Sequence, residues 1–484
     1  MARVVVLGAG VAGHTAALEL RRKLSREHEV VVVTPNRLWN WIPSNIWVGV
    51  GLMTKEDVTF ELSPVYERLG IRYEQARVVE LHPEGSADSG PFVTIERTDP
   101  ERKGLREELT YDFLINATGP KLNFGATPGL GPEHNSLSVC TFDHAAETAT
   151  KLAAAIARMK AGEQLTFVVG TGHGTCTCQG AAFEYVFNLE FEIRQANVRD
   201  RARVVFLTNE AELGDFGVDG MQLKTGGFVV PGKLFAESLF AERGVEWITG
   251  AHVQKVDPGV VHYETLDGEV HALPFDFAML LPPFRGAELL AFDKSGADIT
   301  SAVFAPNGFM KVDADYAAKP YEEWRAEDWP KTYQSPKYPN VFAAGIAFAP
   351  PHAISRPRKT KNGTIIAPAP PRTGMPSGII GRTVAHSIVD MIEHGADAPT
   401  QSASLATMGA ACVASAGASF WRGTAASMTM YPVVPDYQRF PVYGRDLHYT
   451  TGEIGSAGHW IKSLLHRMFL YKAKARPGWW LIPE

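Results

Sequence analysis

Residues 2–36 read ARVVVLGAGVAGHTAALELRRKLSREHEVVVVTPN. An apolar run at Val4–Leu7 leads through Gly8, Gly10 and Gly13 into a helix-forming stretch, and a second apolar run follows at Val30–Val33. In this G-x-G-x-x-G pattern the glycines permit a tight turn, the approach of a pyrophosphate and close packing of helix on strand. Amides at the start of the helix favour the anionic phosphates. The stretch predicts a βαβ unit that binds a dinucleotide.

The end of the second predicted strand leaves the kind of dinucleotide undefined. Thr34 and Pro35 stand where an acid would normally hold a ribose. A hydroxyl or backbone group must then bind the ribose. This motif alone does not choose between a flavin and a nicotinamide dinucleotide.

Three more strand-like runs end in glycine and indicate a second unit. They are YDFLINATG (111–119), LTFVVG (165–170) and PKYPNVFAAGIAF (336–348). Such junctions let a backbone approach a long cofactor at the carboxyl ends of a parallel sheet. Their order predicts an α/β fold with two Rossmann-like dinucleotide-binding domains, the second inserted in the first. We expect the first domain at residues 1–122 and 300–400, the second at 123–299, and a C-terminal region at 401–484.

Composition argues against several other classes of protein. The 484 residues are 45% hydrophobic and 21% charged, which is typical of a folded globular chain. A net charge of −6 argues against a nucleic-acid binder. Four cysteines are too few for a disulfide scaffold, and their spacing matches no zinc site, so no metal is expected. A cysteine with a role here is therefore expected to be catalytic.

The second glycine loop departs from the dinucleotide pattern. It reads GTGHGTCTCQGAAFEYVFN (170–188), with glycines at 170, 172 and 174 followed by Cys176 and Cys178. A loop that takes hydride from NADH would be expected to keep G-x-G-x-x-G and pass directly into a helix. We interpret the nicotinamide site as degraded, with thiol chemistry in its place.

Several segments resemble the sulfide:quinone oxidoreductases, a family of two-dinucleotide-binding-domain flavoproteins in the disulfide-reductase-like superfamily. The most selective is CQGAAFE, from Cys178 to Glu184, which is similar to the family's Cys-x-Gly-Pro/Ala-Ala-x-Glu. The others are WIPSNIWVGVGL (41–52), SVCTFDHAAET (138–148), LLPPFRG (280–286) and PPRTGM (370–375). Together they span roughly residues 3 to 380.

The resemblance implies FAD as the cofactor, and sulfide and a lipid-soluble quinone as partners. In that chemistry sulfide attacks a disulfide or polysulfide bridge, and the released thiolate passes two electrons to the flavin. Cys178 is then the central thiol, Glu184 or His144 the base for hydrosulfide, and Cys140 a further thiol. The residues expected to contact FAD are Gly8, Gly10, Ala12, Gly13, Thr34, Ser44, Asn45, Val78, Ala117, Thr118, Gly119, Gly345, Arg372, Thr373 and Gly374.

The chain also departs from the family at one cysteine. The usual third cysteine is absent, because AAGIAF places Ala347 at the nearest position. Either Cys176 and Cys178 work as a C-x-C redox pair, or Cys178 bonds to Cys140 or holds a polysulfide alone. The C-x-C pair is favoured, because its strain would make the disulfide more oxidising.

Two residues also have a purely structural interpretation, and a third differs from the family. His144 is either a base or a histidine that caps the helix beginning near Ala145. Cys412 is interpreted as structural, because cysteine is often buried as a small hydrophobe and nothing titratable lies near it in sequence. Asp215 stands where many members of the family have a second histidine.

The C-terminus predicts an amphipathic helix in WIKSLLHRMFLYKAK (460–474). One face carries Ile461, Leu464, Leu465, Met468 and Tyr471; another carries Lys462, His466 and Arg467. Basic residues and the pair Trp479–Trp480 favour a helix that lies in a membrane interface without spanning it. The alternative is a surface helix whose apolar stripe packs on the core.

We therefore expect a monotopic membrane flavoenzyme on the cytoplasmic face of a prokaryotic membrane, with homo-oligomerisation left open. One rival is a type-2 NADH:quinone oxidoreductase, which the degraded second loop disfavours. Another is a non-catalytic flavoprotein subunit that binds a membrane partner.

Overall fold

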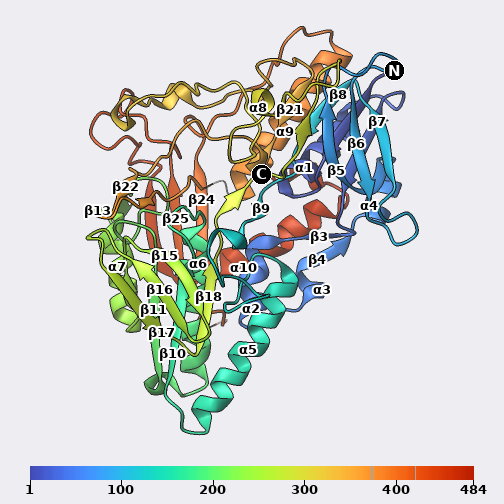
Figure 1. Cartoon of the computed structure of the whole chain (residues 1–484). Coiled ribbons are helices and arrows are strands. Elements are labelled where there is room, and N and C mark those ends of the chain that lie inside the picture. The colour runs from blue at the N-terminus through green and yellow to red at the C-terminus, as the bar shows by residue number, and fades with distance from the viewer. Residues whose placement is uncertain (372–373, 420) are drawn as a thin grey trace.

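The first sheet is built around the N-terminal valine runs. The computed structural model describes residues 1–371, 374–419 and 421–484 (Figure 1). In order across the sheet, the strands are β21 (Val341–Ala343), β8 (Phe113–Asn116), β1 (Arg3–Leu7), β2 (Glu29–Thr34), β5 (Arg72–His82), β6 (Phe92–Arg97) and β7 (Arg106–Thr110). The pairs from β21 to β5 are parallel, with Val4 opposite Val30. Valines buried on both faces are typical of a parallel sheet covered by helices.

The second sheet comes from the chain between β8 and β21. Its four parallel strands are β14 (Glu246–Ile248), β11 (Ala202–Leu207), β10 (Leu165–Thr171) and β18 (Phe277–Leu281). An antiparallel sheet accompanies it, made of β15 (His252–Asp257), β16 (Val260–Glu264) and β17 (Val270–Pro274). Because β21 returns to pair with β8, the second unit is inserted in the first. The predicted fold class is confirmed, and the residue limits given for the domains stay predictions.

Helices pack on these sheets and carry the residues of interest. The longer ones are α1 (Val11–Lys23), α5 (Phe142–Lys160), α6 (Gln179–Gln195), α7 (Gly232–Arg243), α9 (Gly374–Glu393) and α10 (Ser456–Ala473). Short elements are α2 (Asn45–Gly49), α3 (Lys55–Val58), α4 (Ser63–Leu69), α8 (Thr300–Val303), β3 (Leu38–Asn40), β4 (Thr59–Glu61), β9 (Lys121–Leu122), β19 (Phe284–Arg285), β20 (Leu290–Ala291), β22 (Arg358–Lys359) and β23 (Ile365–Ile366).

A five-stranded sheet in the C-terminal region was not predicted. It runs β13 (Phe228–Pro231), β12 (Gln222–Thr225), β26 (Thr451–Gly455), β25 (Ala425–Met430) and β24 (Ala410–Ser415). β12 and β13 form a hairpin from the inserted unit, and Lys224 on β12 pairs with Thr451 on β26. The sheet therefore joins the inserted unit to the strand that leads directly into α10.

Helix α10 confirms the predicted helix but presents its faces in an unexpected way. Lys462 is only 7% exposed and His466 is also buried, whereas Leu464 is 57% exposed and Ile461 is exposed too. The interpretation that the apolar stripe packs on the core is therefore wrong for these two residues. On the face predicted to carry Lys462 and His466, both of these side chains are buried in the protein.

Candidate redox and cofactor site

The first glycine turn forms an open cradle at the start of α1. Gly8 has a φ of +96°, and a Cβ there would lie 2.3 Å from the Ala117 carbonyl oxygen. A Cβ on Gly13 would lie 2.1 Å from the Gly8 oxygen, so strand and helix approach too closely for any side chain. At Gly10, by contrast, no described heavy atom lies within 4 Å of the place a Cβ would take. The residues present therefore fit a phosphate at a helix N-terminus.

The other predicted cofactor residues follow strands of the same sheet. Ala117, Thr118 and Gly119 follow β8, where the Asn116 amide oxygen accepts hydrogen bonds from the Thr118 amide and hydroxyl at 3.3 and 2.8 Å. Gly345 follows β21, and a Cβ placed on it would lie 2.6 Å from the Ala12 Cβ. Their contact with a cofactor stays a prediction.

Five further residues of the predicted cofactor set lie in other elements or are already hydrogen-bonded. Ser44 is buried and its Oγ lies 2.8 Å from Nδ1 of His466 on α10, so that hydroxyl is already engaged. Asn45 exchanges hydrogen bonds of 3.0 Å with Asn40. Thr34 is buried at the end of β2, Val78 lies in β5, and Gly374 begins α9. Arg372 and Thr373 lie outside the described residues.

Three cysteines gather at the N-terminus of α6. Cys178 is the N-cap residue of this helix and adopts a left-handed conformation, with φ 66° and ψ 33°. Burial, with a smaller contribution from the nearby Cys178, raises the pKa of the Cys140 thiol to about 12. Burial likewise raises the pKa of Cys176, with contributions from Cys140 and Cys178. The structure thus brings the three thiols together, and their redox role stays a prediction.

The favoured C-x-C bridge is not formed in this structure. The Cys176 thiol is fully buried and donates a hydrogen bond of 3.0 Å to the Leu281 carbonyl oxygen on β18. The carbonyl of Cys176 accepts from Gln179 Nε2 at 2.9 Å and Asn209 Nδ2 at 3.1 Å. Cys176 is thus fixed by its surroundings, and Asn209 is a positioning residue that the sequence motifs did not reveal.

His144 lies in the first turn of α5, close to Cys140 in sequence. The helix cap is Thr141, whose Oγ1 accepts from the His144 amide at 3.2 Å, so capping by the imidazole is wrong. Its Nδ1 is buried and has no hydrogen-bond partner among the described residues. Burial lowers the pKa of His144, which keeps the ring neutral and able to accept a proton.

Glu184 belongs to a buried polar network rather than standing alone. Its Oε1 forms a short ion pair with Lys462 on α10 and accepts a hydrogen bond from Ser415 Oγ at 2.6 Å. Trp47 on α2 donates to the same Ser415 oxygen at 3.0 Å. Cys412 lies near this network: burial, together with the charge of Glu184, raises the pKa of its thiol to about 11. No titratable residue is close to Cys412 in sequence, but the fold brings Glu184 and Lys462 near it.

The second glycine loop is closed by the chain itself. Ala367 donates its amide to the Gly174 carbonyl at 2.9 Å, and Ala369 donates to the Cys176 carbonyl at 3.0 Å. A Cβ on Gly174 would lie 2.7 Å from His252 Nδ1. Another segment of the chain therefore contacts the loop backbone that a second dinucleotide would approach. This agrees with the interpretation of the nicotinamide site as degraded.

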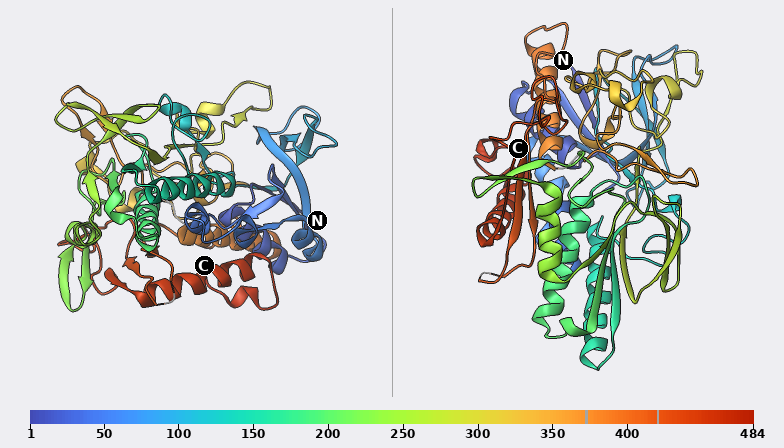
Figure 2. Two further views of the ribbon diagram at one scale, coloured as in Figure 1. Left: turned by 90° about the horizontal axis from the view of Figure 1, so that it is seen from below. Right: turned by 90° about the vertical axis from the view of Figure 1, so that its left-hand side faces the viewer.

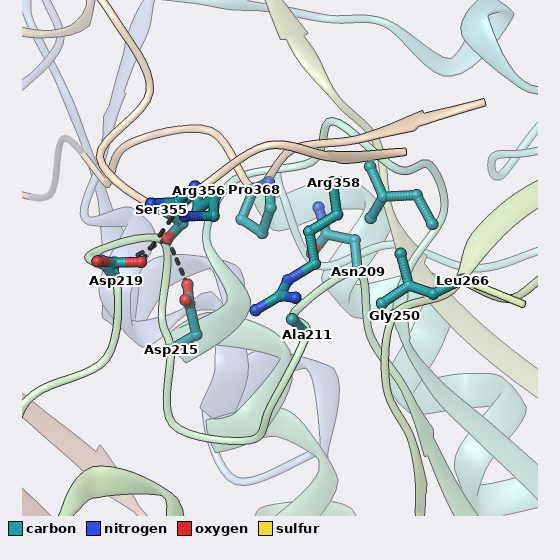
Figure 3. Close-up of a pocket in the computed structure, with 11 residues that line it drawn as sticks. Asn209, Ala211, Asp215, Asp219, Gly250, Leu266, Ser355, Arg356, Arg358 and Pro368 are labelled. Carbon is teal, nitrogen blue, oxygen red and sulfur yellow. Dashed lines mark hydrogen bonds between the residues drawn. The ribbon is translucent and has the colours of Figure 1, made fainter. Parts of the chain in front are cut away.

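A small polar pocket opens beside this closed loop (Figure 3). It holds about 300 Å³ of space not filled by protein and includes Asn209, Arg356 and Arg358 in its lining. Ser355 Oγ donates to Asp215 at 2.5 Å, and burial raises the pKa of Asp215. Asn209 also donates to the Cys176 carbonyl, so this one side chain lines the pocket and contacts the turn that carries the cysteines.

Comparisons show which known proteins the chain is similar to. The pyridine nucleotide-disulphide oxidoreductase family model matches residues 2–187. The sulfide-quinone reductase of Aquifex aeolicus is 28% identical over 473 residues, which cover 97% of this chain and 91% of the relative. The mitochondrial sulfide:quinone oxidoreductase of Mus musculus is 27% identical over 352 residues, covering 71% of this chain and 64% of that protein.

Solved structures support the same conclusion. The X-ray structure of the Aquifex aeolicus sulfide:quinone oxidoreductase matches with a TM-score of 0.75 at 27% identity, covering 98% of this chain and 92% of that chain. NDH2 from Plasmodium falciparum, at 12% identity and a TM-score of 0.65, shares the fold. Over nearly its whole length the chain is therefore similar to the sulfide:quinone oxidoreductases, which are FAD-binding oxidoreductases.

Proposed function

We propose that this protein oxidises sulfide through cysteine thiol chemistry and delivers the electrons through FAD to a membrane quinone. The observation that carries the proposal is the gathering of Cys140, Cys176 and Cys178 beside a second dinucleotide loop that the chain has closed. The closed loop disfavours NADH as the electron donor, and the cysteines offer a site at which sulfide can be the donor instead.

Bound FAD would supply two-electron redox chemistry between the cysteines and the quinone. Gly8, Gly10 and Gly13 would hold its pyrophosphate at the start of α1. Cys178 sits at the N-cap of α6, where the helix dipole favours a thiolate. Its left-handed backbone is an uncommon conformation for a residue with a side chain, and such strain concentrates at functional sites. These features favour Cys178 as the reactive sulfur.

His144 is better suited than Glu184 to take the proton of hydrosulfide. Its Nδ1 is buried, and the lowered pKa keeps the ring neutral, so it can accept a proton. Glu184 already faces the ammonium of Lys462 and the hydroxyl of Ser415. We therefore assign His144 as the base and Glu184 as a positioning residue for the helix that carries Cys178.

Hydrosulfide would enter through the polar pocket beside Asn209. Arg356 and Arg358 line this pocket and offer positive charge to a small anion. In the oxidised enzyme hydrosulfide would attack a sulfur–sulfur bond between Cys178 and its partner, leaving a persulfide on one cysteine and releasing the other as a thiolate. The two electrons released would pass through FAD to the quinone, which would take up two protons as well.

The membrane face is formed by α10 and the β12–β13 hairpin. In both views of Figure 2 the hairpin projects on the same side of the molecule as the C-terminal helix. Phe228 in the hairpin is 75% exposed, and Ile461 and Leu464 on α10 are exposed as well. Apolar side chains gathered on one face favour insertion into a lipid interface. Within the described residues, the helices are too short or too polar to cross a bilayer.

Polar contacts on its inner side hold α10 in this orientation. The ion pair from Lys462 to Glu184 fixes its first half, and His14 Nε2 bonds the Ala473 carbonyl oxygen at 2.7 Å at its end. Because Lys462 contacts the helix that begins at Cys178, α10 borders both the lipid and the redox site. A quinone arriving from the bilayer would therefore have a short path.

Anaerobic titration of the yellow holoenzyme tests the proposal. Sulfide should bleach the flavin absorbance and NADH should leave it unchanged. Bleaching by NADH would favour a type-2 NADH:quinone oxidoreductase, and bleaching by neither would favour a non-catalytic subunit. Cys178→Ser should abolish bleaching by sulfide while retaining bound FAD, whereas full turnover in this variant would overturn the thiol mechanism.

A further inference from the structure

A second pocket lies beside the C-terminal tryptophans, away from the cysteines. Its apolar walls are Leu18 and Leu24 from the first βαβ unit, Leu69 at the end of α4, and the pair Trp479 and Trp480. It holds about 650 Å³ of space not filled by protein. Trp479 is buried and Trp480 is exposed, with their rings at an interplanar angle of 85°. The pocket therefore combines an apolar interior with a tryptophan at its rim.

Three arginines complete the pocket, and no acid lines it in the described part of the chain. Arg21 is only 6% exposed, and its two terminal nitrogens donate to carbonyl oxygens of His28, Leu24 and Ser25 at 2.6–2.8 Å. Its Nε is buried without a hydrogen-bond partner among the described residues. A buried guanidinium with an unused donor is costly unless a ligand accepts from it.

The other two arginines keep unused donors as well as positive charge. Arg26 donates to the Leu69 carbonyl oxygen at 2.7 Å, and Arg22 pairs with Glu19 at 2.7 Å. Glu19 is shared with His386, so it does not neutralise the pocket as a whole. Burial and the nearby charge of Arg26 lower the pKa of Arg21, although Glu393 opposes this. The pocket thus combines positive charge with apolar walls.

The pocket lies where the exposed face of α10 ends. Arg68 on α4 donates to the Lys474 carbonyl oxygen at 2.6 Å, which ties this end of α10 to the wall that carries Leu69. Leu481, next to the tryptophan pair, is exposed. Tryptophan and arginine together are typical of the headgroup level of a membrane. A groove lined by both residue types is therefore suited to a phospholipid headgroup.

We propose that this pocket binds one anionic phospholipid, with the phosphate among the three arginines and one acyl chain against the leucines and tryptophans. The inference rests on the proposed membrane association. Arginine binds phosphate in a planar, bidentate manner, and basic pockets beside lipid surfaces select acidic headgroups. The bound lipid would fix the C-terminal segment on the first domain.

Vesicle sedimentation of the holoenzyme tests this site. The probes are phosphatidylcholine vesicles with and without phosphatidylglycerol. We expect the wild-type protein to bind the anionic vesicles more tightly, and Arg22→Gln/Arg26→Gln to weaken that binding about tenfold. Binding to neutral vesicles and turnover with a water-soluble quinone should not change. Lys103→Gln/Lys160→Gln removes the same charge at exposed positions elsewhere and should leave the preference intact.

The outcomes separate this site from the membrane proposal. Equal binding of the wild type to both vesicles, or equal losses in the two double variants, overturns the lipid pocket and leaves membrane association standing. Binding to neither vesicle overturns both.

A second readout covers failure of the arginine variant to fold. Phosphatidylglycerol with brominated acyl chains should quench tryptophan fluorescence in the wild type, and Trp480→Phe should lose part of that quenching. Inorganic phosphate alone should not compete for the site; full competition would make it a phosphate site and overturn the lipid assignment.

Discussion

Lys462 on α10 forms a buried ion pair with Glu184, six residues after the N-cap cysteine of α6. The pair joins the helix that faces outward to the helix that presents Cys178. A buried pair of this kind contributes little net stability, but removing one partner leaves an uncompensated charge. We therefore expect loss of the ion pair to disturb both α10 and α6.

Lys462→Met should destabilise the protein by about 3 kcal/mol, because Glu184 would remain buried without its cation. Thermal or urea unfolding of the holoenzyme measures this change. The double variant Lys462→Met/Glu184→Gln should recover much of the loss, because the uncompensated charge is gone. Additive losses in the double variant would contradict a direct coupling of the two residues.

His14 should make stability depend on pH. It is fully buried between the Tyr66 hydroxyl and the Ala473 carbonyl, and burial lowers its pKa from 6.5 to about 4. The folded state therefore binds the proton less readily than the unfolded state. The stability from neutral His14 is complete above pH 6.5 and is lost as the pH falls towards 4, by at most about 3 kcal/mol.

Urea unfolding of the wild type and His14→Gln across this range measures the effect. The variant should show a flatter dependence on pH, and the exposed His448→Gln serves as a control that should follow the wild type. Parallel curves for His14→Gln and the wild type would assign the acid sensitivity to other buried groups.

The partner of Cys178 is expected to be Cys140 rather than Cys176. Cys176 is held by the Leu281 carbonyl and by Asn209, so a bridge within the C-x-C segment would break this packing. Cys140→Ala should abolish bleaching by sulfide, and Cys176→Ala should keep most of it. Peptide mapping of the oxidised protein without reductant should find Cys140 and Cys178 joined directly or through added sulfur. A Cys176–Cys178 peptide would restore the C-x-C assignment.

Leu464→Glu should weaken binding to neutral vesicles by about tenfold or more, because the side chain is exposed on the membrane face. The unfolding midpoint should hardly change, since little apolar area is buried there in the folded protein. The matched control is Leu105→Glu, an equally exposed leucine just before β7, which should bind vesicles normally. Equal effects of the two substitutions would argue against a specific membrane face.

The sequence predicted those parts of the molecule whose chemistry is local. The G-x-G-x-x-G turn is such a case, because Gly8 and Gly13 are required by contacts within one βαβ unit. The C-terminal sheet was missed because β24 and β25, AACVAS and AASMTM, have few β-branched or aromatic residues. The periodicity of α10 gave two faces, but only tertiary contacts decide which of them looks inward.

The same limit applies to the site. The Cys178–Glu184 spacing was readable, whereas Lys462, Ser415 and Asn209 come from distant segments with no motif of their own. A buried ion pair between residues 278 positions apart has no signature in one sequence.

The closed second loop also bears on how this enzyme could be re-engineered. Restoring glycines at Cys176 and Cys178 would not create a nicotinamide site, because Ala367 and Ala369 would still hold the loop's carbonyl groups. A change of electron donor would require excision or rerouting of an entire crossing segment. On the proposed function, the course of the backbone excludes NADH as the reductant, and point substitutions alone should not restore its site.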